Sequence, residues 1–463
     1  MKRIRIRKQM TITWSKMVGL LLGACVTGQT FAQEDGRKPN IVVIIADDLG
    51  YADLGSYGNK IIKTPHIDDL ARQGVSFTNA YAGASVCSPS RGTLFTGLHT
   101  GHARIRGNMT RQGGVEGLKG DQTVRRPNLL PQDSTIANVL SNNGYMTTLI
   151  NKWHVDGFDT AAHPLNRGFQ EFHGWLVRED RSHNHYPTIR YHNTEEHIIT
   201  ENLDNKRGSH ATDIATDEAV EFILRKKEKP FFLLLTYNAP HTPLDVKSLD
   251  PYTDIDLPAN DKAYAALITH MDEGIGRVLK AVDDAGISDN TVFIFASDNG
   301  GSREAKLSQL KQNGHLRGAK AQLYEGGLRV PLIIKMPDET NAGSTSNFPA
   351  YFPDLFSTIV DISKSKTTLQ TDGISLVSEI IKPNSLNPGQ RYLYWEQYPR
   401  QGIAQAVRWG DWKLIRQNTD APYELYNLRA DDAEQHNVAD KHPYIVEQLS
   451  GYLKEAHVPS DLW

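Results

Sequence analysis

Long apolar runs recur along the chain and alternate with amphipathic segments. Four of these runs are rich in β-branched or aromatic side chains and occupy residues 40–46, 146–150, 231–237 and 291–297. Unbroken runs of this length are typical of strands buried on both faces of a parallel sheet. Apolar residues from Leu267 to Val282 instead keep three- and four-residue spacings, which indicates one face of a helix. Strands that alternate with helices predict an α/β fold with a large, mostly parallel sheet flanked by helices.

The pattern changes toward the C-terminus. Residues 392–396 and 404–409 are predicted strands, and a helical stretch follows at residues 444–456. We therefore expect a main domain over residues 33–384. A smaller C-terminal subdomain, an antiparallel sheet with a helix, is expected over residues 385–463.

The N-terminus has the composition of a secretory signal. Its first eight residues, MKRIRIRK, are strongly basic, and an apolar run follows at residues 17–26. That run is too short to span a bilayer, and no later segment reaches the roughly 20 apolar residues of a membrane helix. We expect a signal peptide over residues 1–32 and a periplasmic or secreted protein. A lipobox reading remains open, in which Cys25 is acylated and the protein is a lipoprotein.

The overall charge excludes one class of function. The chain has 463 residues and a formal net charge of -3, with 51 basic and 54 acidic side chains. A general nucleic-acid binder would show a broad basic field, so no nucleic-acid partner is expected. Any anionic ligand must be met by local cations.

Acidic and amide side chains follow two of the predicted strands. Asp47 and Asp48 end the first strand, and Asp298 and Asn299 follow the strand at residues 291–297. Ligand sites in open α/β sheets lie at the carboxyl ends of strands. If the two strands are neighbours, these side chains form an all-oxygen site for Ca²⁺ or Mg²⁺. Each pair alone could equally be a helix cap or a turn.

A solitary cysteine lies at a predicted helix start. Cys87 precedes Pro89, and Arg91 lies one turn further on, so backbone N–H groups and a permanent cation both favour an anion at position 87. A buried, inert thiol is the alternative interpretation.

The segment from Cys87 to Gly97 resembles the signature of the type I, formylglycine-dependent sulfatases, a family of the alkaline phosphatase-like superfamily. It matches Cys-x-Pro-Ser-Arg-Gly followed by Leu-x-Thr-Gly. The resemblance extends from NIVVIIADDLGYADLGSYG to the ELYNL segment, through Lys152-Trp153-His154, NAPHTP, SDNG and LRGAKAQLYEGGLRVP. It implies that a separate maturase oxidises Cys87 to Cα-formylglycine. It also favours Ca²⁺ as the metal and counts the modified residue 87 among its ligands.

The same resemblance implies roles for other catalytic residues. Lys152 would bind a sulfate oxygen, and His154 would orient the hydrated aldehyde. His241 would contact the sulfate and the leaving oxygen, while Lys320 would bind sulfate beside Arg91. One departure is that Asn151, rather than the family's usual glycine, precedes the Lys-Trp-His block.

The sequence gives weaker evidence about which residues bind the substrate. His183 and His185 lie in an irregular polar segment, and Arg104 follows the predicted nucleophile helix; we predict that all three bind substrate. The resemblance implies a bacterial carbohydrate sulfatase, and by family analogy its substrate would be a carrageenan-type galactan or a glycosaminoglycan. Two alternatives remain open: a phosphatase or phosphodiesterase of the same superfamily, and a sugar-binding protein with a dead site.

Overall fold

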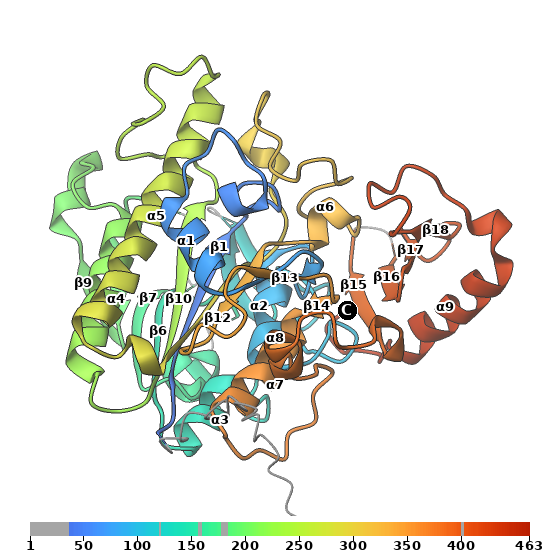
Figure 1. Ribbon diagram of the computed structural model, residues 1–463, viewed down its shortest axis with the longest axis horizontal. Helices are drawn as coiled ribbons and strands as arrows, with labels where there is room; N and C mark the ends of the chain where they lie inside the picture. The colour runs from blue at the N-terminus through green and yellow to red at the C-terminus, as the bar shows by residue number, and fades with distance from the viewer. Residues whose placement is uncertain (1–36, 120–121, 156–159, 177–183, 400–401) are drawn as a thin grey trace, which may run out of the picture. The chain divides into compact units, whose positions relative to one another are not determined.

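A ten-stranded mixed sheet forms the centre of the fold (Figure 1). The computed structural model describes residues 37–119, 122–155, 160–176, 184–399 and 402–463, and Lys38–Trp463 form one unit. The order across the sheet is β13 (Ser344–Ser346), β2 (Val75–Phe77), β12 (Leu332–Lys335), β11 (Thr291–Ser297), β1 (Asn40–Asp47), β10 (Phe231–Pro240), β6 (Met146–Lys152), β7 (Glu171–Trp175), β8 (Ile189–His192) and β9 (Glu195–Ile198). The predicted signal peptide, with Cys25, and His183 lie outside the described residues.

The central strands β11, β1, β10, β6 and β7 are parallel to one another, and they contain all four predicted apolar runs. Every residue of β1, β10 and β11 is buried, as expected for strands covered on both faces. The ladder pairs Ala46 of β1 with Ser297 of β11. Because the strands are parallel and in this register, the residues that follow them meet at one edge of the sheet.

Helices cover both faces of this sheet. One apolar core contains side chains of α1 (Pro65–Gln73), α4 (Ala211–Lys226) and α5 (Ala259–Asp284). The core on the other face contains side chains of α2 (Cys87–Thr96), α3 (Ile136–Asn142), α7 (Phe352–Ile362) and α8 (Val377–Ile381). The short helix α6 (Glu325–Leu328) and two small two-stranded sheets complete this part: β3 (Ala80–Tyr81) with β14 (Ala350–Tyr351), and β4 (Val115–Lys119) with β5 (Gln122–Arg126).

The C-terminal residues form a second, antiparallel sheet. Its order is β15 (Tyr392–Gln397), β16 (Ala404–Trp409), β17 (Trp412–Arg416) and β18 (Glu424–Asn427), and α9 (Pro443–Glu455) packs on β16. The indole Nε1 of Trp395 donates to the carbonyl oxygen of Ala82, 2.9 Å away. The buried Lys413 ammonium lies 2.9 Å from Glu325 and 3.0 Å from Glu434. The predicted fold class is confirmed, while the domain boundary at residue 384 stays a prediction. In the described part of the chain, no helix combines the length and hydropathy needed to cross a membrane.

Candidate active site

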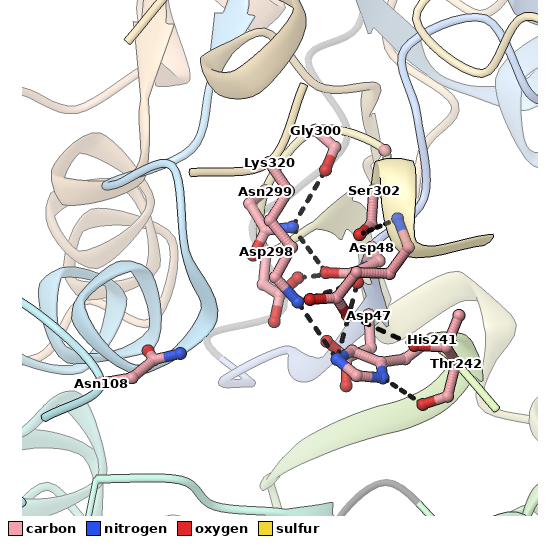
Figure 2. Close-up of polar contacts among 12 residues, drawn as sticks. Asp47, Asp48, Asn108, His241, Thr242, Asp298, Asn299, Gly300, Ser302 and Lys320 are labelled. Carbon is pink, nitrogen blue, oxygen red and sulfur yellow. Dashed lines mark hydrogen bonds and ion pairs between the residues drawn. The ribbon is translucent and has the colours of Figure 1, made fainter. Parts of the chain in front are cut away.

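The two pairs of oxygen-bearing side chains predicted from the sequence, Asp47 with Asp48 and Asp298 with Asn299, lie together at the carboxyl edge of the sheet (Figure 2). The backbone N–H of Asp298 donates to the carbonyl oxygen of Ala46, and that of Asp48 donates to Oδ1 of Asp298 at 3.2 Å. Nδ2 of Asn299 donates to Oδ1 of Asp48 at 2.7 Å. Hydrogen bonds between the ends of β1 and β11 therefore fix the relative positions of these side chains.

Cys87 is the first residue of α2 and is 1% exposed. Burial is the main reason that the pKa of its thiol is raised to about 12, although Lys152 and Lys320 act in the opposite direction. An unmodified thiol here stays protonated at neutral pH, and the thiol form is a poor nucleophile.

Arg91 lies one turn along α2 and is equally buried. Its Nε and Nη2 lie 3.0 and 2.8 Å from Oδ2 of Asp298. Nη1 donates to the carbonyl oxygen of Lys152 at 3.0 Å. Arg91 therefore joins the nucleophile helix to two strand ends.

The end of β6 brings Lys152 and His154 to the same place. Nζ of Lys152 lies 2.5 Å from Oδ2 of Asp47, and both side chains are fully buried. Burial, with the nearby Lys152 charge, lowers the pKa of His154 well below its usual range, so its imidazole is neutral. Asn151, the departure from the family pattern, donates from Nδ2 to Oδ1 of Asn238 at 2.8 Å and so connects β6 to β10.

His241 and Lys320 form a hydrogen-bonded pair beside Asp48. Nδ1 of His241 lies 2.5 Å from the carbonyl oxygen of Thr242. A carbonyl only accepts, so Nδ1 carries the hydrogen and Nε2 accepts from Nζ of Lys320 at 3.1 Å. Lys320 also lies 2.8 Å from Asp48. Burial would lower the pKa of Lys320, but Asp48 raises it well above its usual value.

These side chains surround a pocket of about 420 Å³. Cys87, His154, His241 and Lys320 line it, together with residues that the sequence analysis missed: Val86, Asn108, Met109, Arg126, Ser302, Arg303, Glu304 and Ala321. Arg303 is exposed and Arg126 is buried. Arg303 directly follows the SDNGGS segment. That position was the one sequence feature that could have placed Arg303 in the site.

Several residues of the site have a left-handed backbone without being glycine. Asp48, Asn151, His154 and Ala321 have φ values of 68°, 87°, 66° and 68°. Such conformations are sparsely populated for residues with a Cβ and cluster at functional sites. Neighbouring contacts hold Ala321 in place, because its N–H donates to Ser85 and its carbonyl oxygen accepts from Gln397 of β15.

The predicted substrate-binding residues do not gather in the pocket. His185 is fully buried, and its Nε2 lies 2.8 Å from the carbonyl oxygen of His241. It therefore lies against the loop that carries His241, and its predicted contact with substrate stays a prediction. Arg104 donates to Asn128 and lines a different cavity, beside α2. His183 is outside the described residues.

The oxygen-bearing residues fit a divalent cation. Oδ1 of Asn299 is buried and accepts no hydrogen bond within the described part of the chain, which suits a metal ligand. Burial, followed by the charge of Asp47, raises the pKa of Asp298 to about 7, and a bound cation would offset both effects. Position 87 borders the same place, because ligand atoms of Asp47, Asp48, Cys87 and His241 all lie within 4.8 Å of one another.

Comparisons with known proteins agree with this geometry. The sulfatase family matches residues 39–365, and the family described as N-sulphoglucosamine sulphohydrolase, C-terminal, matches residues 317–458. The chain is 29% identical to an N-acetylgalactosamine-6-O-sulfatase of Bacteroides thetaiotaomicron, covering 94% of this chain and 96% of that protein. It is also 29% identical to a sulfatase of Formosa agariphila, covering 97% and 95% of the two chains. The crystal structure of Ps i-CgsB in complex with k-i-k-neocarrahexaose superposes with a TM-score of 0.78 at 29% identity, covering 90% of this chain and 92% of that one.

The α/β fold and the cationic pocket at its strand ends define a hydrolase of anionic esters. The chain belongs to the sulfatase family and is a sulfuric ester hydrolase. The resemblance seen in the sequence is thereby confirmed.

Proposed function

We propose that this sulfatase is an exported enzyme that removes sulfate from a sulfated polysaccharide or its oligosaccharides, with a formylglycine made from Cys87 as nucleophile and Ca²⁺ as its metal. One observation carries the proposal. The side chain at position 87 lines a pocket together with Lys320 and His241, and the buried carboxylates of Asp47 and Asp48 have oxygens within 4.8 Å of its sulfur. A sulfate ester is an anion, so such a site must combine a nucleophile with fixed cations.

Asp47, Asp48, Asp298 and Asn299 would hold the metal beside residue 87. Once bound, the cation would polarise the sulfate, and the hydrated formylglycine would supply a hydroxyl nucleophile that a protonated thiol cannot replace.

The protein's own side chains perform the remaining work. Lys320, which lines the pocket, and Lys152, now paired with Asp47, would bind the nonbridging sulfate oxygens and so orient the sulfur toward residue 87. Arg91 is held by Asp298 and by the Lys152 carbonyl, so it fixes the start of α2 and the charge of Asp298.

The leaving oxygen needs a proton. His241 has Nδ1–H committed to Thr242 and Nε2 turned to the Lys320 ammonium. The proton that passes from the Lys320–His241 pair reaches the sugar oxygen as the S–O bond breaks. In the net reaction, water supplies the hydroxyl that sulfate gains and the proton that the sugar gains.

Substrate class is supported by charge and by relatives. Arg126 and Arg303 add two cations to the pocket beyond those near residue 87, as a chain with repeated anionic groups requires. Relatives named for N-acetylgalactosamine 6-sulfate and a structure holding a neocarrahexaose point to glycosaminoglycans and carrageenan-type galactans.

The test is direct. The full chain, co-expressed with a formylglycine-generating maturase, is digested, and the peptide carrying residue 87 is weighed. Sulfate release is then measured on defined carrageenan and glycosaminoglycan oligosaccharides, with C87A as control and phosphorylated sugars as competitors. We expect an aldehyde at residue 87 and desulfation that C87A abolishes.

Three results would contradict the proposal. Full activity with an ordinary thiol at residue 87 would exclude the nucleophile. Comparable turnover of phosphate esters would favour the phosphatase alternative, and binding without turnover the dead sugar-binding protein. Export is tested separately, by determining the N-terminus of the mature protein. Cleavage near residue 32 or acylation of Cys25 would support export, and an uncleaved, unacylated N-terminus would contradict it.

A further inference from the structure

Three potential metal ligands from three elements converge away from the catalytic pocket. His173 belongs to β7, His192 to β8 and Glu218 to α4, and one ligand atom of each lies within 4.8 Å of the others. His173 and His192 are directly opposite in the antiparallel ladder, with ring centroids 4.8 Å apart. Figure 1 shows β7 and β9 beside α4 at one end of the large sheet.

The ligand atoms point at one another. Oε1 of Glu218 lies 3.1 Å from Nε2 of His192 and 3.9 Å from Nδ1 of His173. That Nδ1 is buried and has no hydrogen-bond partner in the part of the chain that the structure describes.

Neighbouring side chains hold the carboxylate. The other oxygen of Glu218, Oε2, pairs with Arg190, whose guanidinium lies over the ring of Trp175 with its carbon 4.8 Å from the centroid. Arg190 is itself buried. These contacts leave Oε1 facing the two imidazoles, as outer contacts do in established metal sites.

We propose that His173, His192 and Glu218 bind a divalent transition-metal cation, with Zn²⁺ as the preferred ion. Bonds of about 2.0–2.2 Å in a tetrahedral shell place ligand atoms roughly 3.3–3.6 Å apart, and the observed separations of 3.1 and 3.9 Å bracket this range. Two nitrogen donors suit Zn²⁺ and disfavour Ca²⁺ and Mg²⁺, which take oxygen ligands.

The bound ion would clamp β7, β8 and α4 together. The connection between β7 and β8 includes His185, which supports the His241 loop. The ion is thus expected to stabilise this end of the sheet without taking part in sulfate chemistry.

The test measures zinc in the full chain with Ca²⁺ in large excess, so that the acidic site is occupied. After equilibrium dialysis against Zn²⁺, elemental analysis should find one more zinc per chain in the wild type than in H173Q/H192Q. We expect E218Q to weaken zinc binding by about tenfold or more and to lose the rise in Tm that Zn²⁺ gives the wild type.

H436Q is the matched control, because His436 is an exposed histidine beside an aspartate, Asp431. It should bind zinc as the wild type does. Equal zinc content in wild type, H173Q/H192Q and E218Q would overturn the proposal. If the double variant does not fold, E218Q and the single variant H192Q decide the question by the same two measurements.

Discussion

Nε2 of His185 lies 2.8 Å from the carbonyl oxygen of His241. Burial lowers the pKa of His185 to about 4, so the ring is neutral and its single N–H points at that carbonyl. We expect H185A to lower kcat by roughly 10–100-fold with little change in KM, because small misplacement of a catalytic group has effects of this size. Steady-state kinetics on a sulfated oligosaccharide measure it.

The control for this prediction is H270Q. The ring of His270 packs on His210, which in turn packs on His185, so it is one step further from the His241 loop. H270Q should keep kcat within about twofold. If H185A does the same, His185 does not position His241.

Removing the Lys320 ammonium should depend on the leaving group. K320A takes away the proton donor to Nε2 of His241, and general acids contribute about 10²–10⁴-fold when the leaving oxygen is basic. We expect K320A to reduce kcat/KM far more for a sugar sulfate than for 4-nitrophenyl sulfate, whose leaving group needs no proton. Equal losses on both substrates would mean that Lys320 only binds sulfate.

Chelation should abolish activity, and Ca²⁺ should restore it. N299A removes the amide oxygen of Asn299 from the proposed metal site. We expect the Ca²⁺ concentration that restores half of the activity to rise about tenfold or more in this variant. Replacing the exposed Asn347 is a suitable control. An unchanged Ca²⁺ requirement in N299A would exclude this residue from the metal site.

His210 should make the fold sensitive to acid. Its Nδ1 accepts from the N–H of Thr212 at the start of α4, and burial, together with His185 and His270, lowers its pKa to about 3. The unfolded chain takes up this proton near pH 6.5, whereas the folded one resists until about pH 3. The free energy of unfolding therefore falls as pH decreases below 6.5, at up to about 1.4 kcal/mol per pH unit for this group.

The variant H210N isolates that effect. Asparagine keeps an oxygen acceptor for the helix start but does not titrate. Denaturant unfolding between pH 7 and pH 5 should show a shallower loss of stability for H210N than for the wild type. Identical slopes would assign the acid sensitivity to other groups.

The buried ion pairs that Lys413 forms give a stability prediction. Lys413 is fully buried between Glu325 and Glu434, and K413M would leave both carboxylates without it. Breaking such a group by removing one partner costs about 3–5 kcal/mol, which a fall in Tm and in the denaturant midpoint would report. K280A, which breaks the exposed Lys280–Asp284 pair, should change stability by less than about 1 kcal/mol.

The fold could be predicted from the sequence because its central strands are buried on both faces. Such strands leave continuous apolar runs, and the observed β1 and β11 begin where those runs begin. Asp47 and Asp298 could be placed together for the same reason, since parallel strands end at one edge. The last two strands at one end of the sheet, β8 and β9, are short and mostly half-exposed or exposed, so they carry no comparable pattern.

The pocket wall could not be predicted in this way. Arg126 lies in a small hairpin, and Arg303 follows a loop, where no periodicity tells which side chain points inward. The burial of His185 could not be predicted, because a polar, irregular segment gives no sign of it. Arg104 was predicted to bind substrate because it is close in sequence to α2, but the loop that follows α2 places it in the lining of another cavity.

The left-handed residues around the pocket have an evolutionary consequence. A conformation that Ala321 or His154 would rarely adopt alone persists only while the surrounding structure supplies surplus stability. Mutations elsewhere that erode this surplus should therefore first loosen the loops that aim the catalytic groups, while the sheet remains folded. Selection for turnover in this enzyme would then act on distant packing residues as well as on the groups that touch sulfate.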